Sequence, residues 1–151
     1  WNNEQLLEGF IQNDPELEAQ IRLVFSDLSS LVREREASNR WIYSLRKAGY
    51  KAYYLSNFSA RVKTEASRQL PFLREMDGGI MYYTVQLIKP EPYIYEVLLN
   101  RYKLKAEECV FLDDSPANID TAKSLGMKGI IVESQEQAME ELNKLLKEQG
   151  I

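Results

Sequence analysis

Three short apolar runs of the sequence each end in side chains that are able to do chemistry. The side chains that follow the runs are a hydroxyl with an amide, an ammonium group and a pair of carboxylates: Ser56 with Asn57, Lys89, and Asp113 with Asp114. If the runs are parallel strands, their carboxyl ends share one edge of a sheet, where α/β proteins bind their ligands. A hydroxyl, an ammonium and two carboxylates at one edge would suit a phosphate group and a metal ion.

The carboxylate pair is the most informative of these groups. Asp113 and Asp114 follow the apolar run Cys109–Leu112, and two crowded carboxylates raise each other's pKa unless a cation compensates them. A hard dication such as Mg²⁺ prefers carboxylate oxygens and keeps several waters. The alternative is structural, with Asp114 or Ser115 capping a helix that begins near Pro116.

The other two groups also have structural alternatives. The Ser56 hydroxyl and the Asn57 N–H suit phosphate oxygens near the start of a helix, but the two residues could instead cap that helix or close a turn. Lys89 precedes Pro90, which favours an extended backbone and directs the side chain from a strand end. A lone Lys-Pro pair is more often a surface loop.

The elements that position these groups alternate between strand and helix. The pattern predicts strands over residues 51–55, 79–84, 109–112 and 129–132, and helices over residues 60–70, 91–101, 116–125 and 135–148. Such alternation indicates right-handed βαβ crossovers. We therefore expect an α/β fold, a Rossmann-like parallel sheet covered by helices on both faces.

The first part of the chain is predicted to be helical throughout. Asn13, Asp14 and Pro15 form a helix start, and apolar residues recur at helical spacing from Leu17 to Val32. Another helix ends at Gly49. The pattern predicts two parts, an all-helical segment of residues 1–33 and an α/β core of residues 34–151.

Composition excludes several classes of function. The chain has 151 residues, 44% of them apolar, a net charge of −4 and no basic patch, which argues against nucleic acid as a ligand. No apolar run is long enough for a membrane span. The single Cys109 and the absence of a signal-peptide pattern predict a cytoplasmic protein. The absence of histidine excludes His nucleophiles, Ser-His-Asp triads and most zinc sites.

The ordered set resembles the haloacid dehalogenase-like hydrolase superfamily. Its three later motifs match Tyr54-Leu55-Ser56-Asn57, Ile88-Lys89-Pro90 and Val110-Phe111-Leu112-Asp113-Asp114. Among members, the chain is most similar to small sugar-phosphate phosphatases with a helical cap, of the glucose-1-phosphatase-like kind. The resemblance implies that residues 1–33 are the C-terminal part of that partial helical cap. The resemblance implies a Mg²⁺-dependent phosphohydrolase that acts on a small phosphorylated metabolite.

The resemblance also implies a role for each matching residue. Asp114 would ligate Mg²⁺ directly and Asp113 would assist, while Ser56 and the Asn57 N–H would hold the phosphate. Lys89 would bridge the phosphate and the nucleophile. In the family that nucleophile is the first aspartate of an Asp-x-Asp motif, which forms an aspartyl phosphate that water hydrolyses.

The Asp-x-Asp motif is missing from this sequence. Its nearest imitation ends in Asp27 but has Ser29 at the second acidic position, and Asp27 belongs to the helical pattern of its neighbours. We expect that the chain lacks the first, central strand, in agreement with a start at Trp1 rather than methionine. An upstream segment or a separate chain would supply that strand, and this chain alone would be inactive.

Other functions remain possible from the sequence. A mutase or a dehalogenase would share the superfamily, although dehalogenases need no metal and the carboxylate pair speaks against them. A degenerate member without a nucleophile would be a non-catalytic binding or regulatory module. Response-regulator receivers use similar groups around Mg²⁺, but in receivers the acidic pair comes first, whereas here it comes last.

Overall fold

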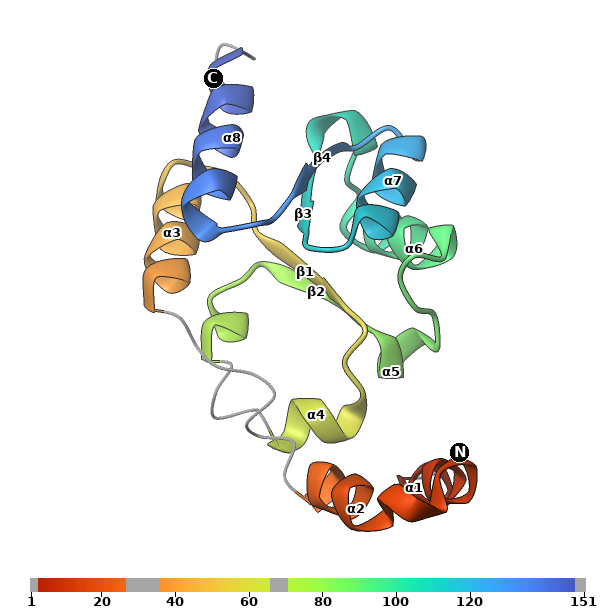
Figure 1. Ribbon diagram of the computed structural model, residues 1–151. Coiled ribbons are helices and arrows are strands. Elements are labelled where there is room, and N and C mark those ends of the chain that lie inside the picture. The colour runs from red at the N-terminus through yellow and green to blue at the C-terminus, as the bar shows by residue number, and fades with distance from the viewer. Residues whose placement is uncertain (1–2, 27–35, 66–70, 149–151) are drawn as a thin grey trace.

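The computed structural model describes residues 3–26, 36–65 and 71–148 (Figure 1). Two helices and a 3-10 turn come first: α1 (Asn3–Asn13), η1 (Pro15–Leu17) and α2 (Glu18–Ser26). The rest alternates between helices and strands. In chain order these elements are α3 (Glu36–Lys47), β1 (Tyr53–Ser56), α4 (Ala60–Glu65), η4 (Pro71–Arg74), β2 (Gly78–Met81), α5 (Tyr82–Val85), α6 (Pro92–Tyr102), η5 (Ala106–Glu108), β3 (Val110–Asp113), α7 (Pro116–Ser124), β4 (Lys128–Ile131) and α8 (Gln135–Glu148).

The four strands form two parallel pairs rather than one continuous sheet. β1 pairs with β2, with Leu55 opposite Ile80, and β3 pairs with β4, with Leu112 opposite Ile130. Within the described residues no strand joins the two pairs. This arrangement confirms the predicted α/β fold and agrees with the prediction that a central strand is absent from the chain.

Helices cover both faces of the strands, as the sequence predicted. Side chains of β3 alternate between two hydrophobic clusters: Phe111 packs against the cluster with Leu55, Ile80 and α6, whereas Val110 and Leu112 pack against the cluster with Ile130 and α8. Figure 1 shows α3 and α8 on one side of the strands and α6 and α7 on the other. A strand whose side chains pack against hydrophobic clusters on both faces is typical of parallel sheets.

A close approach between α6 and β2 requires glycine in that strand. The Tyr102 hydroxyl of α6 accepts a hydrogen bond from the Gly79 N–H at 2.8 Å and contacts the Gly79 carbonyl oxygen at 3.2 Å. A Cβ at Gly78 would lie 2.5 Å from the Tyr102 hydroxyl oxygen. Larger residues at position 78 would therefore displace the ring of Tyr102, and with it the end of α6.

Local hydrogen bonds and backbone geometry explain why the sequence pattern predicted two of the helix boundaries, the start of α8 and the end of α7. At the start of α8, Ser134 Oγ accepts a hydrogen bond from the Gln137 N–H at 3.1 Å, and Gln137 Oε1 accepts one from the Ser134 N–H at 3.4 Å. This reciprocal pair is a capping box. After α7, Gly126 has φ +91°, the left-handed conformation that ends many helices. Both boundaries confirm the predicted ones.

The predicted strand over residues 79–84 is wrong in its second half. β2 ends at Met81, and the next residues form the single turn α5. The run Val85–Ile88 is no strand either, because α5 ends at Val85 and Gln86 has φ +56°. Apolar residues alone could not separate a strand from a buried turn, since both bury alternate side chains.

The all-helical start is a hairpin of α1 and α2. Phe10 of α1 packs against Phe25 of α2, with their ring centroids 5.7 Å apart. η1 begins at Pro15 as predicted, but Asp14 makes no capping hydrogen bond with its side chain. The described part of α2 ends at Ser26, so the predicted continuation to Val32, the position of Asp27 and the boundary between residues 33 and 34 all lie outside the described residues. The division into cap and core stays a prediction.

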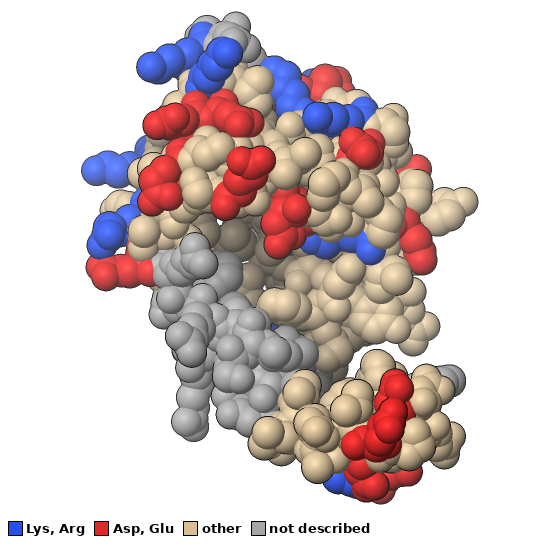
Figure 2. Space-filling view, in the orientation of Figure 1, with Lys and Arg blue, Asp and Glu red and all other residues tan. Residues whose placement is uncertain are grey.

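Charged side chains of both signs are mixed over the upper part of the face that Figure 2 shows. The prediction that nucleic acid is not a ligand stays a prediction. None of the helices in the described ranges combines the length and the apolar character that crossing a bilayer requires.

Candidate functional site

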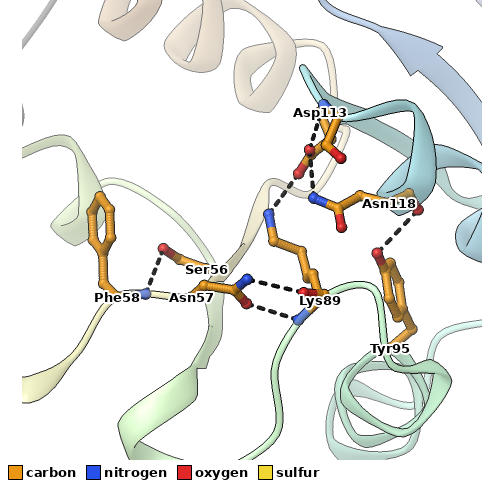
Figure 3. Close-up of polar contacts among 8 residues, drawn as sticks. Ser56, Asn57, Phe58, Lys89, Tyr95, Asp113 and Asn118 are labelled. Atoms are coloured by element: carbon orange, nitrogen blue, oxygen red, sulfur yellow. Dashed lines mark hydrogen bonds and ion pairs between the residues drawn. The ribbon is translucent and has the colours of Figure 1, made fainter. Parts of the chain in front are cut away.

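Lys89 and Asp113 meet across the space between the two strand pairs. Lys89 Nζ lies 2.5 Å from Asp113 Oδ2, and both side chains are largely buried, with 13% and 7% of their surface exposed. Asp113 is the last residue of β3, whereas Lys89 lies in the loop that leads from α5 to α6. Figure 3 shows the lysine side chain extending from this loop toward the end of β3. The prediction that Lys89 leaves the end of a strand is therefore wrong, although the ammonium does reach the predicted edge.

Asp113 receives three hydrogen bonds. Besides Lys89, Asn118 Nδ2 donates to Asp113 Oδ1 at 2.7 Å and the Ser115 N–H donates to the same oxygen at 3.0 Å. Burial raises the pKa of the Asp113 carboxyl, but the hydrogen bonds from Lys89, Asn118 and Ser115 outweigh burial, and its pKa lies below the usual range. The cation that compensates Asp113 is the lysine ammonium, so this carboxylate stays ionised without a metal.

Asn118 and Tyr95 support Asp113 from α7 and α6. Asn118 is buried, and the Tyr95 hydroxyl donates to the Asn118 carbonyl oxygen at 3.0 Å. Burial, with a smaller contribution from the Asp113 charge, raises the pKa of Tyr95 to about 12. Tyr95 therefore stays a neutral donor at physiological pH. Tyr95 was not identified from the sequence, because it lies among the apolar residues of α6.

Ser56 is the last residue of β1 and Asn57 follows it, on the other side of the site, as Figure 3 shows. Ser56 Oγ accepts a hydrogen bond from the Phe58 N–H at 3.2 Å, so Ser56 closes a turn as its structural alternative proposed. The Asn57 side chain makes two hydrogen bonds with the backbone of Lys89: Oδ1 accepts from the N–H at 2.8 Å and Nδ2 donates to the carbonyl oxygen at 3.1 Å. The sequence did not predict the contact between Asn57 and Lys89, because the two residues are far apart in the chain.

Asp114 differs from its neighbour. It is exposed, and no hydrogen bond or ion pair within the described part of the chain involves its side chain. The helix-capping alternative is not observed, since Ser115 at the start of α7 makes no capping hydrogen bond with its side chain and the Ser115 N–H is bonded to Asp113 instead. The Asp114 carboxylate is thus open to solvent at the same strand end.

Two neighbouring carboxylates at the end of β3 could serve as ligands of a magnesium ion. Mg²⁺ is commonly held by one or two protein carboxylates together with waters and substrate phosphate. Asp113 and Asp114 supply such oxygens, and no three carboxylate, thiol or imidazole side chains gather among the described residues. The residues present fit one side of a magnesium site, in which Asp114 offers the uncommitted carboxylate.

Thr121 also anchors the loop that contains Lys89 and Pro90, a contact that the sequence did not predict. Thr121 Oγ1 of α7 donates to the Pro90 carbonyl oxygen at 2.9 Å, next to a cis peptide bond between Lys89 and Pro90. Two loop residues are therefore held from opposite sides, Lys89 by Asn57 and Pro90 by Thr121.

Comparisons with known proteins agree with this geometry. Residues 3–126 match the model of the haloacid dehalogenase-like hydrolase family. Over 86 residues the chain is 40% identical to bifunctional epoxide hydrolase 2 of Mus musculus, a match that covers 57% of this chain and 14% of the relative. The chain thus spans only about a seventh of that protein.

Solved structures show the same fold. A HAD family enzyme of Bacteroides thetaiotaomicron, solved in complex with magnesium and inorganic phosphate, superimposes with a TM-score of 0.63 at 20% identity, over 71% of this chain and 58% of that one. A predicted HAD-like family hydrolase of Porphyromonas gingivalis gives a TM-score of 0.64 at 26% identity, over 74% and 57% of the two chains. This chain belongs to the haloacid dehalogenase-like hydrolase family.

Proposed function

We propose that the chain is a C-terminal part of a Mg²⁺-dependent phosphohydrolase that acts on a small phosphorylated metabolite of the sugar-phosphate type. The observation that carries the proposal is the buried pair of Lys89 and Asp113, which places one ammonium group at the edge where β1 ends in Ser56 and continues to Asn57. In this proposal the Ser56 hydroxyl and the Asn57 N–H bind phosphate oxygens, and the Lys89 ammonium neutralises them.

Magnesium is assigned to the carboxylate pair. Asp114 is the direct ligand because its carboxylate is exposed and uncommitted, while Asp113, already bonded to Lys89, assists. The magnesium and phosphate bound to the Bacteroides thetaiotaomicron relative support magnesium as the metal. The ion would neutralise charge on the transferring phosphoryl group.

Hydrolysis also needs a nucleophile, and no Asp-x-Asp motif is present in the sequence. We propose that an upstream segment or a separate chain contributes a strand that ends in this motif and lies between β1 and β3, where the two parallel pairs face each other without hydrogen bonds. Its first aspartate would attack phosphorus and expel the ester oxygen, and water would then cleave the aspartyl phosphate. This chain alone would therefore bind phosphate without turnover.

Two assays test the proposal. The 151-residue chain is expected to bind Mg²⁺ and inorganic phosphate in calorimetric titrations, and to leave p-nitrophenyl phosphate intact. Asp114→Asn should abolish Mg²⁺ binding while the fold is retained. Joined to a segment that carries the motif, the chain should hydrolyse the ester in the presence of Mg²⁺. Turnover by the unassisted chain would contradict the assignment of the nucleophile.

One observation favours a second candidate, a non-catalytic phosphate-binding module. The sequence lacks the nucleophile but retains the three later motifs. This pattern is expected of a protein that still binds phosphate but no longer catalyses hydrolysis. Under this alternative the coding sequence before Trp1 would carry no apolar strand ending in Asp-x-Asp, and phosphate binding would be unchanged by any added segment.

A further inference from the structure

We infer that Asn57 is a positioning residue, which sets the location of the Lys89 ammonium through the backbone of Lys89 and not through contact with substrate. This inference rests on the proposed function for its consequence in phosphate binding, but its structural part is independent of that function. It assigns a second task to a residue whose backbone N–H alone was expected to bind phosphate.

The geometry of the two hydrogen bonds carries the inference. The Asn57 amide pairs with both backbone groups of one residue, accepting from the Lys89 N–H at 2.8 Å and donating to the Lys89 carbonyl oxygen at 3.1 Å. A planar amide that satisfies an N–H and a C=O together fixes the position and the orientation of that peptide segment, as a neighbouring strand would. The residue after β1 thus substitutes for sheet pairing in the loop after α5.

Lys89 needs such a support because no strand holds it. It follows α5 by four residues in a loop, and its side chain spans the distance to Asp113 at the end of β3. A lysine has four rotatable side-chain bonds, so its ammonium is placed reproducibly only if its Cα is fixed. Asn57 fixes the backbone and Asp113 fixes the charged end.

The connection also joins the two strand pairs. Asn57 belongs to the end of β1 and Asp113 to the end of β3, and the described strands β1 and β3 share no hydrogen bonds. Asn57, Lys89 and Asp113 therefore form one polar bridge from one pair to the other (Figure 3). Displacing its first member is expected to displace the ammonium at the middle of the bridge.

The first test observes the ammonium directly in the 151-residue chain. Exposed lysine NH₃⁺ groups exchange their hydrogens with water too rapidly for detection in ¹H–¹⁵N NMR spectra, whereas a buried, ion-paired group is detectable. Lys89→Arg assigns the Lys89 signal by removing it. Asn57→Ala is expected to abolish the signal, and Thr121→Val is the matched control because it removes a hydrogen bond to the adjacent Pro90 without affecting the Lys89 backbone.

The inference is overturned if Asn57→Ala retains the Lys89 signal, or if Thr121→Val loses it equally, since Asn57 would then only help to anchor the loop. If Asn57→Ala does not fold, Asn57→Asp replaces it, because a carboxylate keeps the shape but cannot donate to the Lys89 carbonyl. That variant should also lose the signal, and a retained signal would contradict the inference.

The second test measures the affinity for inorganic phosphate. Asn57→Ala should weaken binding about tenfold, and the double variant with Lys89→Met should bind no more weakly than Lys89→Met alone, because both substitutions remove the same ammonium contact. Additive losses would show that Asn57 acts independently of Lys89 and would overturn the inference. If the unaltered chain binds no phosphate, the proposed function fails while the NMR comparison still decides the role of Asn57.

Discussion

Asp113 and Asp114 are neighbours of identical chemistry in opposite environments. The first is buried against Lys89 and Asn118, and the second is exposed. The sequence reasoning treated the pair as a unit that needs a metal, but the structure shows that a lysine already compensates one member. Asp113 thus holds the site together through its hydrogen bonds, whereas Asp114 offers a free carboxylate.

We expect Asp113→Asn to lower the free energy of unfolding by about 3 kcal/mol, because it leaves the buried Lys89 ammonium without its carboxylate. Asp114→Asn is the matched control and should change stability by less than about 0.5 kcal/mol, as is usual for an exposed position. Urea unfolding followed by circular dichroism measures both. Equal losses in the two variants would contradict the division of roles.

Asp77 is expected to link stability to pH. Its carboxylate accepts a hydrogen bond from the Ala52 N–H at 2.9 Å and lies 3.3 Å from Arg46 Nε. The hydrogen bond from Ala52, aided by Arg46, lowers the pKa of Asp77 below its ordinary value of 3.8. The stabilisation is therefore complete above that value and is lost as the pH falls through the lower pKa of the folded state.

Asp77→Asn should accordingly destabilise the chain by about 1 kcal/mol at pH 7. The difference from the unaltered chain should shrink as the pH falls below about 4, because the unaltered carboxyl is then protonated as well. Urea midpoints measured between pH 2.5 and pH 7 test this. A difference that stays constant over that range would show that the charge of Asp77 contributes nothing.

At the scale of elements, helix boundaries that are set by local hydrogen bonds should be sensitive to single substitutions. Ser134→Ala removes the acceptor for the Gln137 N–H at the start of α8 and should cost about 1 kcal/mol. Ser124→Ala is the control, since the Ser124 hydroxyl only donates back to the Thr121 carbonyl within α7. Thermal unfolding measures the loss of stability in each variant, and a larger loss for Ser124→Ala than for Ser134→Ala would contradict the prediction.

The sequence predicted those elements well whose signals are local. Ser134 and Gly126 marked boundaries of α8 and α7, and the strands β3 and β4 were placed to within a residue. Residues 82–88 were misread because the turn α5 and the left-handed Gln86 follow from packing around β2, which a pattern of apolar residues does not encode. The two hydrogen bonds between the Asn57 amide and the Lys89 backbone could not be foreseen either, because the two residues are far apart in the chain.

The candidate site was predictable in its members but not in its connections. Ser56 and Asp113 come to one region because parallel strands end at one edge, and the Lys89 ammonium reaches this region from the loop after α5. The pairing of Asp113 with the lysine depends on the side to which Asp113 points from β3. That side is fixed because Phe111 and Leu112 pack on opposite faces of the strand. The roles of these residues in phosphate and metal binding stay predictions.

For the whole molecule, burial separates the α/β part from the helical hairpin. Ile94 of α6 has none of its surface exposed, whereas Leu23 of α2 is 73% exposed. Ile94→Ala should therefore cost about 3 kcal/mol through the cavity it creates, and Leu23→Ala less than about 0.5 kcal/mol. Urea unfolding measures both, and a comparable loss for Leu23→Ala would show that α2 is packed as tightly as α6.

The hydroxyl of Tyr102 has a consequence for association between molecules. An uncovered strand edge invites pairing with strands of other chains, and proteins commonly block such edges. Tyr102 contacts both the N–H and the carbonyl oxygen of Gly79, so at this residue β2 has no free backbone groups for an incoming strand. Intermolecular β-pairing at the side of β2 that faces α6 is thereby disfavoured. Tyr102→Phe should consequently increase the tendency of the chain to aggregate, as measured by light scattering at constant concentration.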